Sequence, residues 1–82
     1  MSSDNILYRF GGFEADVREG ELRRDGKIVP IESKPFETLV FFLENPGKRI
    51  TKEQILDSIW KDTFTEKISV SVCILKIRKA LD

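Results

Sequence analysis

Residues 65–82, TEKISVSVCILKIRKALD, carry the pattern that most restricts how this chain can fold. Apolar side chains recur in it at i, i+4, i+7 and i+11, which lines them along one side of an α-helix: Val70, Ile74, Ile77 and Leu81. Thr65 suits the N-cap, because its hydroxyl can accept a hydrogen bond from a first-turn amide. The sequence therefore predicts an amphipathic helix over 65–82 that packs one side on a core.

The other side of this predicted helix carries short and basic side chains. Ser69, Val72, Lys76 and Lys79 face away from the core, with Ile68 and Leu75 at the edge and Ser71, Cys73 and Arg78 on the flanks. Basic residues in the last turns complement the carbonyl end of the helix dipole, and this alone explains many such patterns. The same set also suits a recognition helix, in which short side chains reach base edges and cations hold phosphates. Both interpretations remain open on this helix alone.

Composition limits the remaining classes of protein. The chain has 82 residues, one Cys and no His, so we expect one small domain over 1–82 without an internal disulfide, a zinc site or a cofactor. The longest apolar run, 39–43, is far shorter than the roughly 20 residues of a membrane-spanning helix. The opening residues MSSDN lack the basic start of a secretory signal. These features predict a cytoplasmic protein.

The formal net charge of zero argues against a nucleic-acid binder on average. The charges are unevenly distributed, however. Residues 1–45 hold six Lys or Arg against nine Asp or Glu, and residues 46–82 hold eight against five. This asymmetry gives weak support for a basic face in the second half.

The first third of the chain predicts a small antiparallel sheet over 1–32. Extended segments are expected at 6–10, 13–17, 22–24 and 27–31, separated by glycine-containing turns. Asp25-Gly26 is a strong hairpin signal, because both central positions of a type I′ turn need positive φ. A two-residue loop there pairs Leu22 with Val29 and Gly20 with Ile31.

Residues 33–82 predict a unit of three helices. The first begins near Ser33 and stops at Asn45-Pro46-Gly47, and 48–50 follow as a short extended piece. Thr51 and Gln54 form a capping box at the start of the second helix, which runs to Trp60. Two helices joined by a short loop, the second with a polar and basic face, indicate a helix-turn-helix.

These segments carry a resemblance to a known family. YRFGGFEAD, LRRDGKIVPIESKPFETL, FFLENPGKRITKEQILDSIW and SVSVCILKIRKALD resemble the winged-helix effector domain of the OmpR/PhoB transcription regulators. More narrowly, they resemble the variant at the N-terminus of ToxR- and CadC-like proteins. The resemblance implies an α+β winged helix-turn-helix: a four-stranded antiparallel sheet followed by three helices. It also implies sequence-specific binding to double-stranded DNA, and places the chain in two-component or phosphorelay signalling.

The resemblance also implies roles for individual residues. It places Ser69, Ser71, Val72 and Cys73 at positions that enter the major groove, Lys76 and Lys79 near bases or phosphates, and Arg78 on a phosphate. Trp60 matches a tryptophan that touches the DNA backbone through its indole N–H. The loop at 61–65, from Lys61 to Thr65, matches a segment that can contact RNA polymerase.

Three departures from the family favour an alternative function. Ile68 and Leu75 stand where polar or basic residues are frequent, and Cys73 stands where His is common. The family continues with a C-terminal β-hairpin wing, which the sequence to Asp82 lacks. The alternative is a protein-interaction or oligomerisation module, and we expect this 82-residue form to self-associate.

An enzyme is the remote third class, because the sequence has no His, no phosphate-cradling glycine loop and no nucleophile elbow. Glu53 and Asp57 lie one helical turn apart, but such pairs are usually solvated surface. The sequence therefore predicts a binding protein.

Overall fold

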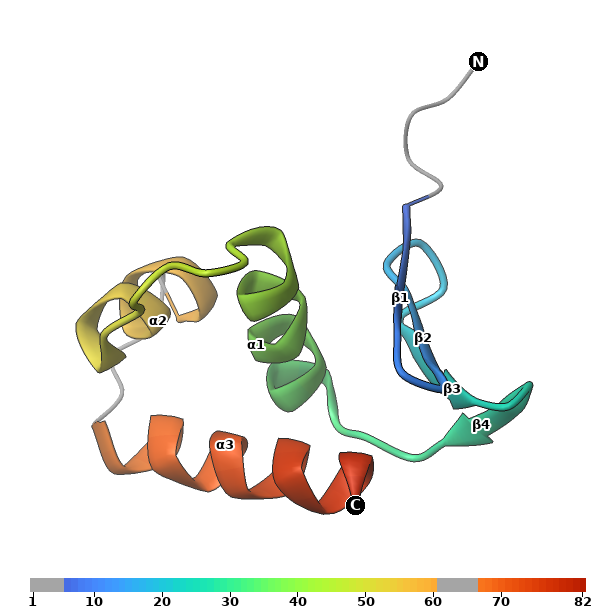
Figure 1. The fold of residues 1–82 in the computed structure, drawn as a ribbon. Coiled ribbons are helices and arrows are strands. Elements are labelled where there is room, and N and C mark those ends of the chain that lie inside the picture. The colour runs from blue at the N-terminus through green and yellow to red at the C-terminus, as the bar shows by residue number, and fades with distance from the viewer. Residues whose placement is uncertain (1–5, 61–66) are drawn as a thin grey trace.

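The computed structural model describes residues 6–60 and 67–82, which form a four-stranded antiparallel sheet followed by three helices (Figure 1). The strands are β1 (Leu7–Phe10), β2 (Phe13–Asp16), β3 (Glu21–Arg24) and β4 (Lys27–Val29), paired in that order. The helices are α1 (Ser33–Glu44), α2 (Lys52–Ile59) and α3 (Lys67–Leu81). The predicted order of strands and helices is confirmed.

The β3–β4 hairpin follows from its turn residues. Asp25 and Gly26 have φ of 52° and 84°, so both central positions take the left-handed conformation of a type I′ turn. This turn sets the register that pairs Leu22 with Val29, as predicted.

The predicted continuation of this hairpin to a pair between Gly20 and Ile31 is wrong, because β4 ends at Val29. Pro30 follows and has no N–H to donate to a ladder. Gly20 has a φ of 67° and donates its amide to the carbonyl of Asp16 at 2.8 Å, so it belongs to the turn between β2 and β3.

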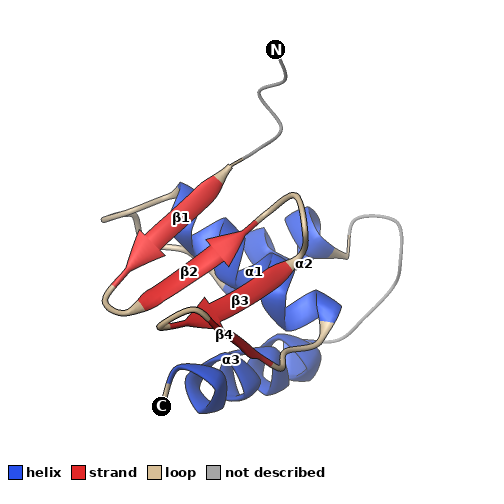
Figure 2. Cartoon of the chain, turned by 90° about the vertical axis from the view of Figure 1, so that its right-hand side faces the viewer, coloured by secondary structure: helices blue, strands red, loops and turns tan. Residues whose placement is uncertain are grey.

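The two faces of the sheet differ in polarity. Ala15 and Leu22 are fully buried and pack on α1 and on the C-terminal end of α3, where the core residues are Phe36, Leu39, Val40 and Ile77. The helices therefore cover one face of the sheet (Figure 2). Arg23 alternates to the other face, where it forms ion pairs with Glu14, Asp16 and Glu21.

Helix α1 begins and ends as its sequence predicts. Pro35 lies in the first turn, where the missing N–H costs no intrahelical hydrogen bond. The helix ends at Glu44 with Asn45 as its C-cap residue, and Gly47 beyond it has a φ of 74°. Its N-cap residue is Glu32, whose side chain makes no capping hydrogen bond.

Helix α2 begins with the predicted capping box. Thr51 Oγ1 accepts from the Gln54 amide at 3.1 Å, and Gln54 Oε1 accepts from the Thr51 amide at 2.8 Å. Ile55 anchors the helix with 1% of its surface exposed, and Trp60 is the C-cap residue. Residues 48–50 before it form no strand in the described part of the chain.

Helix α3 packs against both α1 and α2, and its last turn reaches the sheet. Val70 and Ile77 are buried as predicted, whereas Ile74 and Leu81 are half-buried. The predicted N-cap, Thr65, lies outside the described residues. At the other end, Arg24 Nη1 donates to the Asp82 carbonyl at 2.8 Å and ties α3 to the β-hairpin.

Candidate nucleic-acid interface

The outward surface of α3 is fixed by the residues on its inward side. Val70 is fully buried and Ile77 is 7% exposed, so the helix has one orientation on α1 and α2. The side chains that leave this packed side are exposed or half-buried. Among the predicted site residues, Val72, Lys76, Arg78 and Lys79 are exposed, and Trp60, Ser69 and Ser71 are half-buried.

Cys73 differs from the other predicted site residues in being buried. The residue is 6% exposed and lies on the buried side of α3 with Val70 and Ile77. Burial raises the pKa of the Cys73 thiol, so the side chain stays a neutral packing group. The spacing of these three residues, i, i+3 and i+7, is itself a helical stripe, and it was the sequence signal for this outcome.

An open groove of about 460 Å³ runs between the N-terminal end of α1 and α3. Its lining includes five of the predicted site residues, Trp60, Ser69, Val72, Cys73 and Lys76, together with Lys34 of α1. The groove therefore joins the end of α2 to the outward surface of α3, as a single DNA-contacting surface requires.

Lys34 is a cation of this groove that no sequence pattern predicts. Its Nζ donates to the Ile59 carbonyl at 2.9 Å and lies 5.9 Å from the centre of the Trp60 ring. This position places a positive charge over the face of the Trp60 ring, as in a cation–π contact. No local pattern connects residue 34 with residue 60, because the contact exists only once α1 and α2 have packed.

Lys76 is held by the acidic N-cap residue of α1. Its Nζ forms an ion pair with Glu32, the N-cap residue whose side chain makes no cap. The hydrogen bond that Lys76 donates to the Glu32 carboxylate raises the pKa of Lys76 and keeps it charged. Within residues 6–60 and 67–82, Arg78 and Lys79 take part in no ion pair. The cations of α3 thus differ in their availability for an anionic ligand.

The Glu53 carboxylate also has an ion-pair partner. It forms an ion pair with Lys67 at the start of α3, and the hydrogen bond from Lys67 lowers the pKa of the Glu53 carboxyl. The carboxylate links α2 to α3 and remains ionised. This environment suits a structural contact between the two helices.

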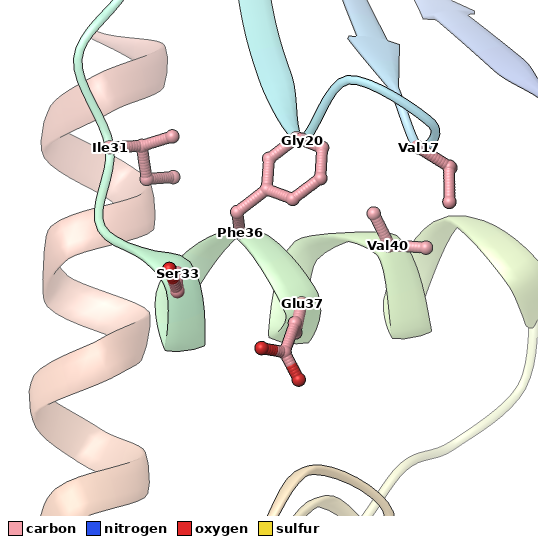
Figure 3. A pocket seen from close by; sticks show the side chains of 7 residues that line it. All are labelled: Val17, Gly20, Ile31, Ser33, Phe36, Glu37 and Val40. Carbon is pink, nitrogen blue, oxygen red and sulfur yellow. The ribbon is translucent and has the colours of Figure 1, made fainter.

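A second pocket, of about 300 Å³, lies between α1 and the turn that connects β2 to β3 (Figure 3). Val17 and Gly20 line it from this turn, and Phe36, Glu37 and Val40 line it from α1. None of the predicted site residues contributes to it. The candidate interface is therefore the α3 surface and its groove.

Two further features are absent from the described residues. These residues contain no cluster of three or more His, Cys, Asp or Glu that could hold a metal ion. They also contain no helix with the length and apolarity needed to cross a bilayer.

The sheet, the three helices and the exposed basic side of α3 define a winged helix-turn-helix protein. The family model "Transcriptional regulatory protein, C terminal" matches residues 26–82. The chain belongs to this family, and the resemblance to OmpR/PhoB-type DNA-binding domains is confirmed.

Individual relatives agree with this assignment. The transcriptional regulatory protein TrcR of Mycobacterium tuberculosis is 33% identical over 75 residues, which cover 90% of this chain and 29% of TrcR. The structure of the response regulator DrrB, an OmpR/PhoB homologue of Thermotoga maritima, has a TM-score of 0.79 at 36% identity and covers 89% of this chain and 33% of DrrB. The chain thus spans about a third of the length of these relatives.

The fold also matches the DNA-binding domain of Klebsiella pneumoniae RstA, solved in complex with its RstA box. The TM-score is 0.77 at 22% identity, covering 92% of this chain and 75% of that domain. The predicted fold class is confirmed by these neighbours.

Proposed function

We propose that this chain is the sequence-specific DNA-binding domain of a cytoplasmic transcription regulator, with α3 in the major groove of double-stranded DNA. The observation that carries this proposal is the α3 surface itself. It presents exposed cations beside short side chains, and a groove links it to Trp60 and Lys34. Membership of a family of transcriptional regulatory proteins supports the same function.

The exposed residues divide by the chemistry they offer to DNA. Lys79 and Arg78, which form no ion pair with other described residues, can hold phosphates, and Lys76 can do so by exchanging Glu32 for a phosphate. Ser69, Ser71 and Val72 lie nearer the N-terminal end of α3, where a recognition helix contacts base edges. Trp60, at the edge of the groove, is proposed to donate its indole N–H to a backbone phosphate.

The test is selection of bound duplexes from a randomised pool, followed by a salt titration of the selected duplex. Affinity should fall as salt rises, with a log–log slope that changes by about 0.9 for each phosphate neutralised. Lys79→Ala should flatten the slope, and Lys76→Ala should weaken binding with little change in slope, because Glu32 offsets the counterion that Lys76 releases. Arg18→Ala, on an exposed turn of the sheet, serves as the matched control. If no duplex binds at low salt, or if neither lysine matters, this function is wrong.

A contact to RNA polymerase through residues 61–65 stays a prediction, because those residues lie outside the described part of the chain. A regulator that recruits polymerase through this loop would lose activation, but keep DNA binding, when the loop is replaced. An in vitro transcription assay beside the binding assay separates the two properties.

Self-association is the second candidate function, and the exposed apolar residues of α3 favour it. Ile68 and Leu75 are 64% and 60% exposed. Burying such side chains between two copies would stabilise a dimer. Sedimentation of concentrated protein should then show a dimer that Ile68→Ser/Leu75→Lys disrupts, and a strictly monomeric parent would reject this candidate.

A further inference from the structure

Three branched apolar side chains form one exposed row on α3. Ile68, Val72 and Leu75 occupy positions i, i+4 and i+7 and are 64%, 42% and 60% exposed. We call them the apolar stripe. The inward side of α3 has its own apolar row, which includes Val70 and Ile77, so the stripe is additional to the packing of the helix.

The surroundings of the stripe indicate an anionic occupant with apolar groups on its surface. The row continues at i+11 to Lys79, and Lys76, which is paired with Glu32, lies beside the row on α3 in the lining of the groove. An apolar protein partner would have to desolvate these cations, which is costly without paired anions. Duplex DNA fits this combination. Its phosphates flank the major groove and can pair with the lysines, while the stripe reaches the base edges on the floor of the major groove.

The only apolar group that base edges present in the major groove is the C5-methyl of thymine. Seven residues of α-helix rise about 10 Å, and successive base pairs are about 3.4 Å apart, so the stripe matches about three base pairs. We propose that the apolar stripe reads a run of thymine methyl groups and makes A·T pairs of one orientation the preferred target. This inference rests on the proposed DNA binding and names the feature of DNA that it selects.

The experiment uses the duplex obtained by selection and removes methyl groups without altering base pairing. Each thymine is replaced in turn by deoxyuridine, which lacks only the C5-methyl. We expect affinity to fall about fourfold for each buried methyl, within a window of about three base pairs. Replacing one thymine in this window by cytosine should weaken binding, and 5-methylcytosine at the same place should restore part of the loss.

Variants of the stripe connect the effect to named residues. Ile68→Ala and Leu75→Ala should each bind the thymine duplex more weakly and lose sensitivity to deoxyuridine at one position. Ile28→Ala is the matched control, because Ile28 is 65% exposed but lies on β4. Thermal melting of each variant shows whether it keeps the fold, and the salt slope should stay unchanged because no cation is removed.

The possible outcomes distinguish the thymine proposal from the DNA binding on which it rests. Salt-dependent binding that ignores deoxyuridine at every position overturns the thymine reading and leaves DNA binding intact. Absence of binding to any duplex overturns both. A dimer that Ile68→Ala or Leu75→Ala dissociates, together with no effect of deoxyuridine, overturns the thymine reading and assigns the stripe to a second copy of the chain.

Discussion

The ion pair between Glu32 and Lys76 should restrain DNA binding, and Glu32→Gln should release it. Both side chains are exposed, 69% for Glu32 and 48% for Lys76, so the exchange of partners needs no rearrangement of the core. When Lys76 moves to a phosphate, the phosphate releases a counterion, but the abandoned Glu32 carboxylate takes one up. In the Gln variant the release has no such compensation.

This reasoning gives a magnitude. One uncompensated counterion makes the log–log slope of affinity against salt steeper by about 0.9. Between 50 and 200 mM salt, a fourfold change, the variant should therefore lose about 3.5 times more affinity than the parent protein. Its advantage over the parent should be greatest at low salt.

The assay is fluorescence anisotropy with the selected duplex over a series of salt concentrations. Glu19→Gln is the matched control, because it removes the same charge from an exposed turn of the sheet. In a Lys76→Gln background the effect of Glu32→Gln should disappear. Equal slopes for the parent, Glu32→Gln and Glu19→Gln would refute the proposed competition between the carboxylate and DNA.

Three other predictions follow from single residues. Val70→Ala deletes fully buried methyl groups at the anchor of α3 and should cost roughly 2–3 kcal/mol, a fall in melting temperature of roughly 10–20 °C, and a circular dichroism melt within a few degrees of the parent would contradict it. Burial raises the pKa of the Cys73 thiol in the folded state. The contribution of the neutral thiol to the free energy of unfolding should therefore be complete below the unfolded-state pKa of about 8.5 and be lost as pH rises through the folded-state pKa. Urea unfolding at a series of pH values should show this loss in the parent protein and not in Cys73→Ala. Trp60→Phe should keep the fold and weaken DNA binding by about one hydrogen bond, roughly 0.5–1.5 kcal/mol in a titration, whereas unchanged affinity with a lower melting temperature would make Trp60 a packing residue.

Features decided by neighbouring residues could be predicted from the sequence. The Asp25-Gly26 turn and the Thr51 capping box each depend on two to four consecutive residues, and the structure contains both. The predicted pair between Gly20 and Ile31 was wrong, because the prediction extended the hairpin without considering Pro30 or the turn to which Gly20 belongs.

The candidate site was less accessible, because it depends on how helices distant in sequence pack. The sequence of α3 is compatible with two apolar stripes, and only one of them includes Cys73. Packing against α1 and α2 determines that the stripe with Cys73 is the buried one. Lys34 meets Trp60 across 26 positions of sequence, and Glu32 meets Lys76 across 44. Neither contact has a local signal, yet both determine which cations the site can offer.

The distribution of charge in the structure resolves the objection that a chain of zero net charge should not bind DNA. A cluster of three carboxylates, Glu14, Asp16 and Glu21, lies on the sheet face opposite the helices, where Arg23 neutralises part of it. The cations of α3 lie on a different side of the molecule, and fields from exposed charges fade over about 8–10 Å at physiological salt. A phosphate bound at α3, as proposed, would therefore respond to the local cations and to Glu32, and the acidic sheet would orient the domain so that α3 meets the duplex first.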